Sequence, residues 1–166
     1  MSVIAISACL MGNPCRYNGS SALNNELFQL VKGRNVLLFC PEIMANLPTP
    51  RAPLEIIGGN GHDVTKGQAM VVNRDGVNMT DEFLNGTQCA MALFVNNKVS
   101  VVVLKERSPS CGVNEIYDGS FSGRLIKGCG VLTARLLQSG LKIFSDEEIP
   151  LFKQWLDEQE RVCADE

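Results

Sequence analysis

Three cysteines in loops rich in glycine or proline are the residues of this chain best suited to chemistry. Cys9 begins the segment Cys-Leu-Met-Gly, Cys40 begins Cys-Pro-Glu, and Cys111 lies within Ser-Pro-Ser-Cys-Gly. Thiolates are soft ligands that favour zinc, copper(I) or iron–sulfur clusters. Tight turns let backbone amides approach the sulfur atoms and tune such a centre. The three cysteines therefore predict a metal site, and the alternative is that they only fill the core.

The other potential ligands bear on which metal is expected. Structural zinc sites usually have four ligands, often from paired Cys-x-x-Cys segments. This chain has no Cys-x-x-Cys segment and a single histidine, His62, which we expect in an exposed loop. Three thiolates at a cleft suit a cubane iron–sulfur cluster with one iron left open. Cys15 follows Cys9 in the same loop and is either a fourth ligand or a thiol beside the site.

The remaining three of the seven cysteines have simpler interpretations. Cys89 lies in a helical pattern and is expected to fill the core. Cys129 lies between two glycines before a helix and is expected to be structural. Cys163 is close to the C-terminus and is expected at the surface.

Polar residues near the three cysteines are candidates for the reaction itself. Glu42, in a loop bounded by prolines, is suited to proton transfer, although a solvated surface acid is the alternative. Ser108 and Ser110 are able to donate to a substrate or to an oxyanion, or only to cap their loop. Arg16 and Arg51 are able to bind an anion or stack on a base, but single arginines usually serve the surface.

The elements that must position these residues alternate between strands and helices. Apolar runs predict strands at about 3–7, 35–39, 99–104 and 141–144. Helical spacing predicts helices at about 23–31, 80–96, 131–139 and from 150 onward. Two short strands are expected on either side of a turn at 74–76, whereas 40–61 is expected to be irregular.

This alternation predicts a three-layer α/β/α, Rossmann-like fold with a mostly parallel sheet. Ligands bind such sheets beyond the carboxyl ends of the strands. Cys9, Cys40 and Cys111 each follow a predicted strand, so we expect them at the same edge.

Length and composition fit a single domain over residues 1–166. The chain has 45% hydrophobic and 20% charged residues, which argues against bulk disorder. A net charge of −3 argues against a broad electrostatic grip on nucleic acid. The first residues do not resemble a secretory signal, and no apolar run is long enough to cross a bilayer. We therefore expect a cytoplasmic protein without a membrane partner, in a compartment where cysteines stay reduced.

The sequence resembles the short thiouracil desulfurases, or desulfidases, a family formerly known only as a domain of unknown function. The resemblance covers nearly the whole chain, and its most specific segments are Ile6–Gly12, Cys15–Gly19, Cys40–Glu42, Pro50–Arg51 and Lys105–Gly112. It implies a 4Fe–4S cluster held by Cys9, Cys40 and Cys111, with one iron free to bind the sulfur of a thiolated pyrimidine. Glu42 matches the family's acid/base residue and Ser108 a serine at the site. Cys15, Arg16 and Ser110 are candidates for a position beside the cluster or the substrate.

The reaction implied by the resemblance is non-redox hydrolysis of 2- or 4-thiouracil to uracil and hydrogen sulfide. One alternative is desulfuration of 4-thiouridine in tRNA, which the acidic net charge disfavours. A second is a non-catalytic zinc- or cluster-binding module that senses metal or oxidation. A third is a thiol redox enzyme, against which the missing Cys-x-x-Cys segment speaks.

Overall fold

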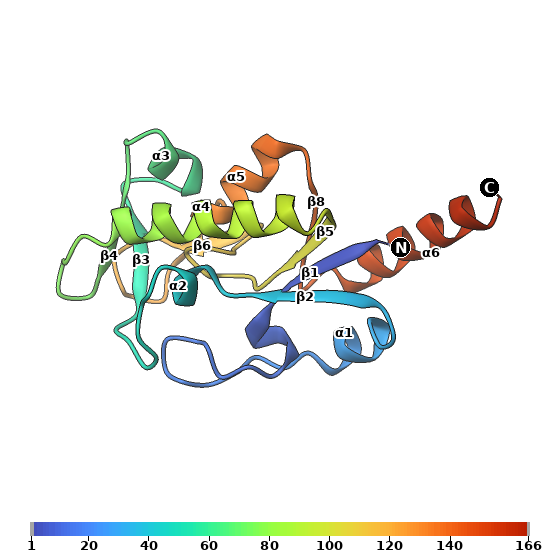
Figure 1. The fold of residues 1–166 in the computed structure, drawn as a ribbon. Coiled ribbons are helices and arrows are strands. Elements are labelled where there is room, and N and C mark those ends of the chain that lie inside the picture. Colours follow the sequence, from blue (N-terminus) through green and yellow to red (C-terminus); the bar gives the residue numbers. More distant parts are fainter. Residues whose placement is uncertain (1, 166) are drawn as a thin grey trace.

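A parallel sheet of four strands forms the centre of the computed structural model, which describes residues 2–165. The strand order is β2-β1-β5-β8, and all three pairings are parallel (Figure 1). The strands are β1 (Val3–Ser7), β2 (Asn35–Phe39), β5 (Val99–Leu104) and β8 (Lys142–Ser145). Their bounds agree closely with the four apolar runs of the sequence, because buried parallel strands are apolar on both faces.

Successive side chains of these strands enter two separate cores. On β1, Ile4 and Ile6 pack with α1 (Asn25–Leu30) and α6 (Ile149–Ala164). Ala5, between them, faces the opposite core with α4 (Thr80–Asn96) and α5 (Val131–Ser139). This alternation is the period of two of an extended strand.

Helices therefore cover both faces of the sheet, and the predicted three-layer α/β/α architecture is confirmed. Figure 1 shows α4 and α5 together on one side and α1 on the other. The predicted helices at 80–96 and 131–139 match α4 and α5.

The segment between β2 and α4 is more regular than the sequence predicts. It contains α2 (Pro41–Met44), β3 (Leu54–Ile57) and α3 (Gly61–Thr65), which were not expected, and β4 (Met70–Asn73), which is the first of the two short strands expected around the turn at 74–76. Pro41 begins α2, a position where its missing N–H is not needed. The expectation of an irregular 40–61 segment is therefore wrong in part.

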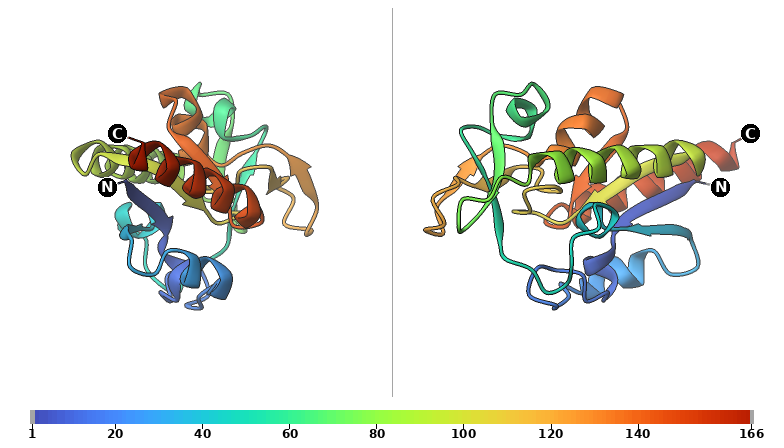
Figure 2. Two further views of the ribbon diagram at one scale, coloured as in Figure 1. Left: turned by 90° about the vertical axis from the view of Figure 1, so that its right-hand side faces the viewer. Right: turned by 60° about the vertical axis from the view of Figure 1, so that its left-hand side comes forward.

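Two small antiparallel pairs lie beyond the carboxyl edge of the sheet. β3 pairs with β4, and β6 (Glu115–Tyr117) pairs with β7 (Leu125–Lys127). The expected second strand at 77–79 is reduced to a single bridge between Val72 and Asn78, because β4 pairs with β3 instead. Figure 2 shows both pairs at one end of the molecule, with both termini at the other end.

A third apolar core joins these pairs to α3 and α4, and it contains Ile56, Val71, Phe83 and Ile116. None of the helices within residues 2–165 has the length and apolar character needed to span a membrane.

Candidate active site

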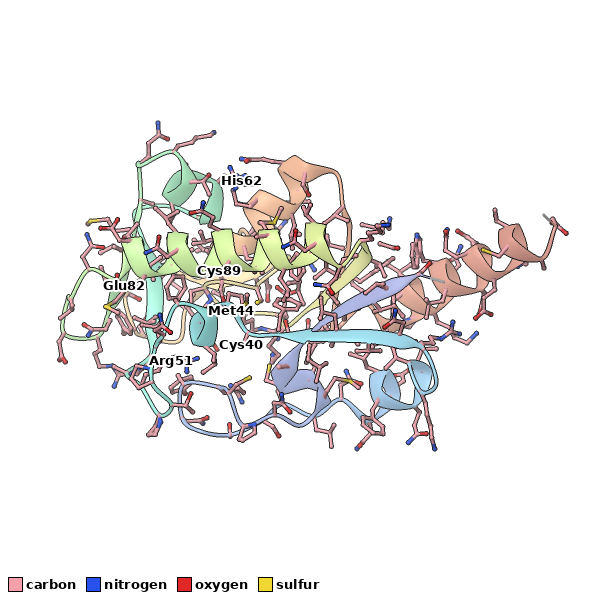
Figure 3. All side chains as sticks on the ribbon, in the orientation of Figure 1. Cys40, Met44, Arg51, His62, Glu82 and Cys89 are labelled. Atoms are coloured by element: carbon pink, nitrogen blue, oxygen red, sulfur yellow. The ribbon has the colours of Figure 1, made fainter. Side chains whose placement is uncertain are left out.

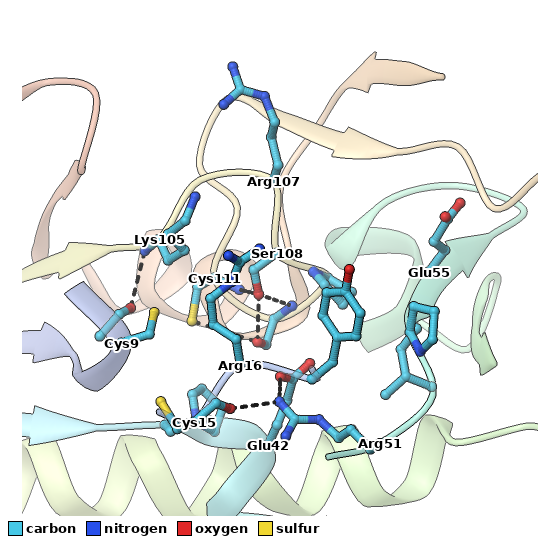
Figure 4. Close-up of a pocket in the computed structure, with 18 of the residues that line it drawn as sticks. Cys9, Cys15, Arg16, Glu42, Arg51, Glu55, Lys105, Arg107, Ser108 and Cys111 are labelled. Carbon is cyan, nitrogen blue, oxygen red and sulfur yellow. Dashed lines mark hydrogen bonds and ion pairs between the residues drawn. The ribbon is translucent and has the colours of Figure 1, made fainter. Parts of the chain in front are cut away.

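A cavity of about 430 Å³ lies where β1, β2 and β5 end. Cys9, Cys40 and Cys111 all line it, each from the segment that follows one of these strands. Figure 4 shows Cys9, Cys15 and Cys111 around this space. Three thiols far apart in the sequence thus border one cavity, because the strands that precede them are parallel and adjacent.

Short connections fix the first two of these thiols at the sheet edge. Cys9 is buried in η1 (Ala8–Met11), a short 3-10 helix that begins directly after β1. Cys40 is the residue between β2 and α2, where the chain is still extended. The hydroxyl of Ser7, at the end of β1, accepts a hydrogen bond from the backbone N–H of Lys105 at 3.1 Å, which joins the ends of β1 and β5.

The third thiol lies in a loop held by its own serines and by α5. The Oγ of Ser108 accepts hydrogen bonds from the backbone N–H groups of Ser110 at 3.2 Å and Cys111 at 3.1 Å. The N–H of Leu132, in the first turn of α5, donates to the carbonyl of Ser110 at 3.0 Å. Gly130 makes this approach possible, since a Cβ there would lie 2.8 Å from the nitrogen of Cys111.

A buried carboxylate, that of Glu106, binds the backbone that follows the Cys111 loop. Glu106 is 2% exposed and accepts hydrogen bonds from the N–H groups of Val113, Asn114 and Glu115 at 2.8, 2.9 and 3.1 Å. Burial raises its pKa, but hydrogen bonds from Ser145 and these amides lower it more, and the net pKa is lowered. Glu106 therefore holds the loop as a charged acceptor.

Three of the thiols that line the cavity, those of Cys15, Cys40 and Cys111, have raised pKa values. The Cys15 thiol contacts those of Cys40 and Cys9; the Cys40 contact lowers its pKa, but the Cys9 contact and burial raise it more. Contact with Cys15, together with burial, raises the pKa of Cys40 well above its ordinary value. Burial raises the pKa of Cys111 to about 12. A bound metal centre would supply the positive charge that turns such thiols into thiolate ligands.

Glu42 lies in the cavity wall next to these thiols and is paired with Arg51. The two side chains form an ion pair and are only 15% and 5% exposed. The same guanidinium nitrogen donates to the backbone carbonyl of Cys15 at 3.1 Å (Figure 4). One arginine therefore connects the acid to the loop that carries Cys15.

The exposure of five residues tests expectations from the sequence. Cys89 is exposed on α4 (Figure 3), so the expectation that it fills the core is wrong. Cys129 is buried and Cys163 exposed, as predicted. His62 is half-buried within α3 rather than exposed in a loop. Arg51 does not serve the surface, because its side chain is only 5% exposed and bonds to Glu42 and to the carbonyl of Cys15.

The chemistry of these donors suits an iron–sulfur cluster. Cys9, Cys40 and Cys111 line one cavity, and thiolates are the ligands that hold such clusters. Within residues 2–165, no three side chains of histidine, cysteine, aspartate or glutamate are grouped so that they could hold one metal ion.

Fold and site together define an α/β protein with a thiol-lined cavity at the carboxyl edge of a parallel sheet. A family model described as 2-thiouracil desulfurase matches residues 4–148. The chain is 42% identical to the uncharacterized protein YbbK of Bacillus subtilis (strain 168), over 89% of this chain and 97% of that protein. The chain belongs to the 2-thiouracil desulfurase family, a family of enzymes.

A solved structure supports the same relationship. The 4Fe–4S-dependent thiouracil desulfidase TudS superposes with a TM-score of 0.81 at 38% identity. The match covers 95% of this chain and 99% of that one.

Several cavity residues were not identified from the sequence. Glu55, Tyr117 and Phe121 all line the cavity, but they come from β3 and from the β6–β7 pair. The strands of that pair are too short for a periodic pattern to reveal. The burial of Arg51 has no local signal either, because distant parts of the chain enclose it.

Proposed function

We propose that this protein hydrolyses the carbon–sulfur bond of 2- or 4-thiouracil, giving uracil and hydrogen sulfide, at a 4Fe–4S cluster held by Cys9, Cys40 and Cys111. The observation that carries the proposal is the cavity itself, because it brings these three thiols together with Glu42 and Ser108. Membership of the 2-thiouracil desulfurase family supports the substrate class. The similarity to the 4Fe–4S-dependent desulfidase TudS supports the cofactor.

The overall reaction changes no oxidation state. A water oxygen forms a bond to the ring carbon that carried sulfur, the carbon–sulfur bond breaks, and sulfur leaves with two protons as hydrogen sulfide. When bound, the cluster supplies a Lewis-acidic iron for the sulfur of the substrate.

In the proposed reaction, Glu42 moves the protons. Its carboxylate lies in the wall of the cavity, so it is able to take a proton from the attacking water and return it to a departing group. Arg51 fixes the orientation of that carboxylate through the ion pair. A general base that is fixed in this way does not have to reorganise during the reaction.

In the proposed reaction, Ser108 holds an oxygen of the substrate or of the attacking water. Its Oγ already accepts two backbone N–H bonds, from Ser110 and Cys111. Its own proton therefore remains available as a donor, to the hydroxyl of Ser110 at 2.9 Å or to a bound ligand. Arg16 and Ser110 line the same cavity and complete its polar wall.

The test uses protein purified and loaded with iron and sulfide without oxygen. We expect about four irons per chain and release of uracil and sulfide from 2- or 4-thiouracil. Cys9→Ser, Cys40→Ser and Cys111→Ser should each lose the cluster and the activity. Cys89→Ser, an exposed cysteine on α4, is the matched control and should keep both.

Each other outcome rejects a different part of the proposal. Iron without turnover of either base would reject the substrate. Bound zinc, or no metal after loading, would reject the cluster. Retention of four irons in the Cys111→Ser protein would reject the ligand set.

A further inference from the structure

The wall of the cavity away from the cysteines is formed by a short hairpin that the sequence does not reveal. Tyr117, at the end of β6, and Phe121, in the connection to β7, both line the cavity. Glu55 lies beside them on β3, across the cavity from Cys9 and Cys111 (Figure 4). A substrate held by the sulfur site would have its ring between these two walls.

Phe121 has an unusual backbone conformation for an aromatic residue. Its φ is 57°, in the left-handed region that bulky side chains rarely adopt. Such a conformation persists only when the surrounding structure imposes it, and it occurs most often at binding and catalytic sites. In a connection whose other residues from Ser120 to Arg124 are exposed, Phe121 alone is half-buried.

A buried carboxylate imposes this conformation. Glu55 is 8% exposed and accepts hydrogen bonds from the backbone N–H groups of Gly119 at 3.0 Å and Phe121 at 3.1 Å, both through Oε1. Gly119 allows the connection to lie directly on β3, since a Cβ there would come within 2.6 Å of the Ile56 carbonyl oxygen. No lysine or arginine pairs with Glu55 among the described residues, so these amides are its polar partners.

The ring of Phe121 is held as well as its backbone. The guanidinium of Arg74 lies over the ring, 5.9 Å from its centroid. Backbone and side chain are therefore both restrained, by residues from β3 and from the turn after β4.

We propose that Phe121 is a substrate-binding residue whose ring packs against the planar heterocycle of the substrate, and that Glu55 is the positioning residue that holds it there. The inference rests on the proposed function, since it assigns the ring-binding wall of the same site. A planar unsaturated base suits an aromatic wall, because its ring stacks without specific hydrogen bonds.

The experiment compares Phe121→Ala and Phe121→Leu in the loaded enzyme. Stacking of a base on an aromatic side chain contributes about 1–3 kcal/mol, so Phe121→Ala should raise the KM for thiouracil and the Kd for uracil about 5- to 150-fold. The kcat should change less than about threefold, because the ring does not touch the reacting atoms. Phe121→Leu keeps an apolar contact but no flat ring, so its KM and Kd should lie between those of the wild type and of Phe121→Ala.

Glu55→Gln tests the positioning role through non-additivity. It should raise KM in the wild-type background and have no further effect on KM in a Phe121→Ala background. Leu125→Ala is the control, because Leu125 is exposed on β7 and does not line the cavity. It should leave KM unchanged.

Two results would overturn the inference while the proposed function stands. One is a Phe121→Ala enzyme with wild-type KM and wild-type uracil affinity. The other is a double variant whose increase in KM equals the product of the increases caused by Glu55→Gln and Phe121→Ala separately. A wild-type enzyme that binds no uracil and releases no sulfide from thiouracil would instead reject the proposed function and this inference together.

Discussion

Arg51 and Glu42 form a largely buried ion pair in the wall of the cavity, and Arg51 also donates to the carbonyl of Cys15. The backbone N–H of Arg51 donates in addition to the carbonyl of Tyr17 at 2.7 Å. The arginine therefore joins the loop after β1 to the acid that follows β2. Any movement of Arg51 would change the placement of Glu42 relative to the thiols.

Substitution of Arg51 should lower kcat more than it raises KM. Arg51→Met leaves the Glu42 carboxylate without its partner, and a displacement of about 1 Å of a catalytic group costs about 100-fold in rate. Arg51→Lys keeps the charge but not the planar fork, so its kcat should be intermediate. Steady-state kinetics with thiouracil as substrate measure both constants.

Arg34→Met provides the matched control, because Arg34 and Glu160 form a partly exposed ion pair outside the cavity wall. Removal of one partner of a buried pair also costs about 3–5 kcal/mol of stability, so circular dichroism must first show that the Arg51 variants are folded. A folded Arg51→Met enzyme with the kcat of wild type would show that the pair has no part in orienting Glu42.

The layers of the fold were predictable because they depend on local patterns. The valines of 99–104 and the apolar spacing of 80–96 and 131–139 each identify an element without knowledge of the rest. The β6–β7 pair was missed because a strand of three residues has no measurable period. Cys89 was misplaced for a related reason: helical spacing identifies the helix, but tertiary packing decides which face is buried.

Only the part of the candidate site that lies at the edge of the sheet was predictable from the sequence. Parallel strands put the residues that follow them at one edge, and this rule places Cys9, Cys40 and Cys111 around one cavity. Contacts made by long-range packing have no comparable rule. The pairing of Arg51 with Glu42 and of Glu55 with the hairpin required the folded structure.

Substitution of Cys15 should leave the cluster intact. The Cys15 thiol contacts those of Cys40 and Cys9, but the proposed ligand set is complete without it. Cys15→Ala, prepared and assayed without oxygen, should therefore keep about four irons per chain and turn over thiouracil within about threefold of wild type. Iron analysis and the visible spectrum measure the cluster content, and Cys40→Ala provides the cluster-free comparison. Loss of iron in the Cys15→Ala protein would make Cys15 a ligand.

Removal of the Ser108 hydroxyl should reduce the rate more than removal of the Ser110 hydroxyl. Ser108→Ala loses a donor at the reaction site, which typically costs about 100- to 1000-fold in kcat. It also leaves two amides without an acceptor, at a cost of about 1–3 kcal/mol of stability. Ser110→Ala loses contacts to Ser108 and to the sulfur of Cys111 at 3.6 Å, and its kcat should fall less. Equal rates for the two variants, in folded protein with full iron content, would remove Ser108 from the mechanism.

Glu106 should contribute stability that disappears in acid. Its folded-state pKa is lowered, because hydrogen bonds from Ser145 and the amides of residues 113–115 outweigh the effect of burial. A group with a lowered folded pKa contributes its full stability above its unfolded value of about 4.3 and loses it as the pH falls through the folded value. Glu106→Gln should therefore lower the free energy of unfolding by about 2–4 kcal/mol near neutral pH and by clearly less below about pH 4.

Urea unfolding at the two pH values measures this difference in stability. The control is Glu160→Gln, at an exposed ion pair, which should change the free energy of unfolding by less than about 1 kcal/mol. If the effect of Glu106→Gln were the same at both pH values, the charge on Glu106 would not be what holds the loop of Cys111.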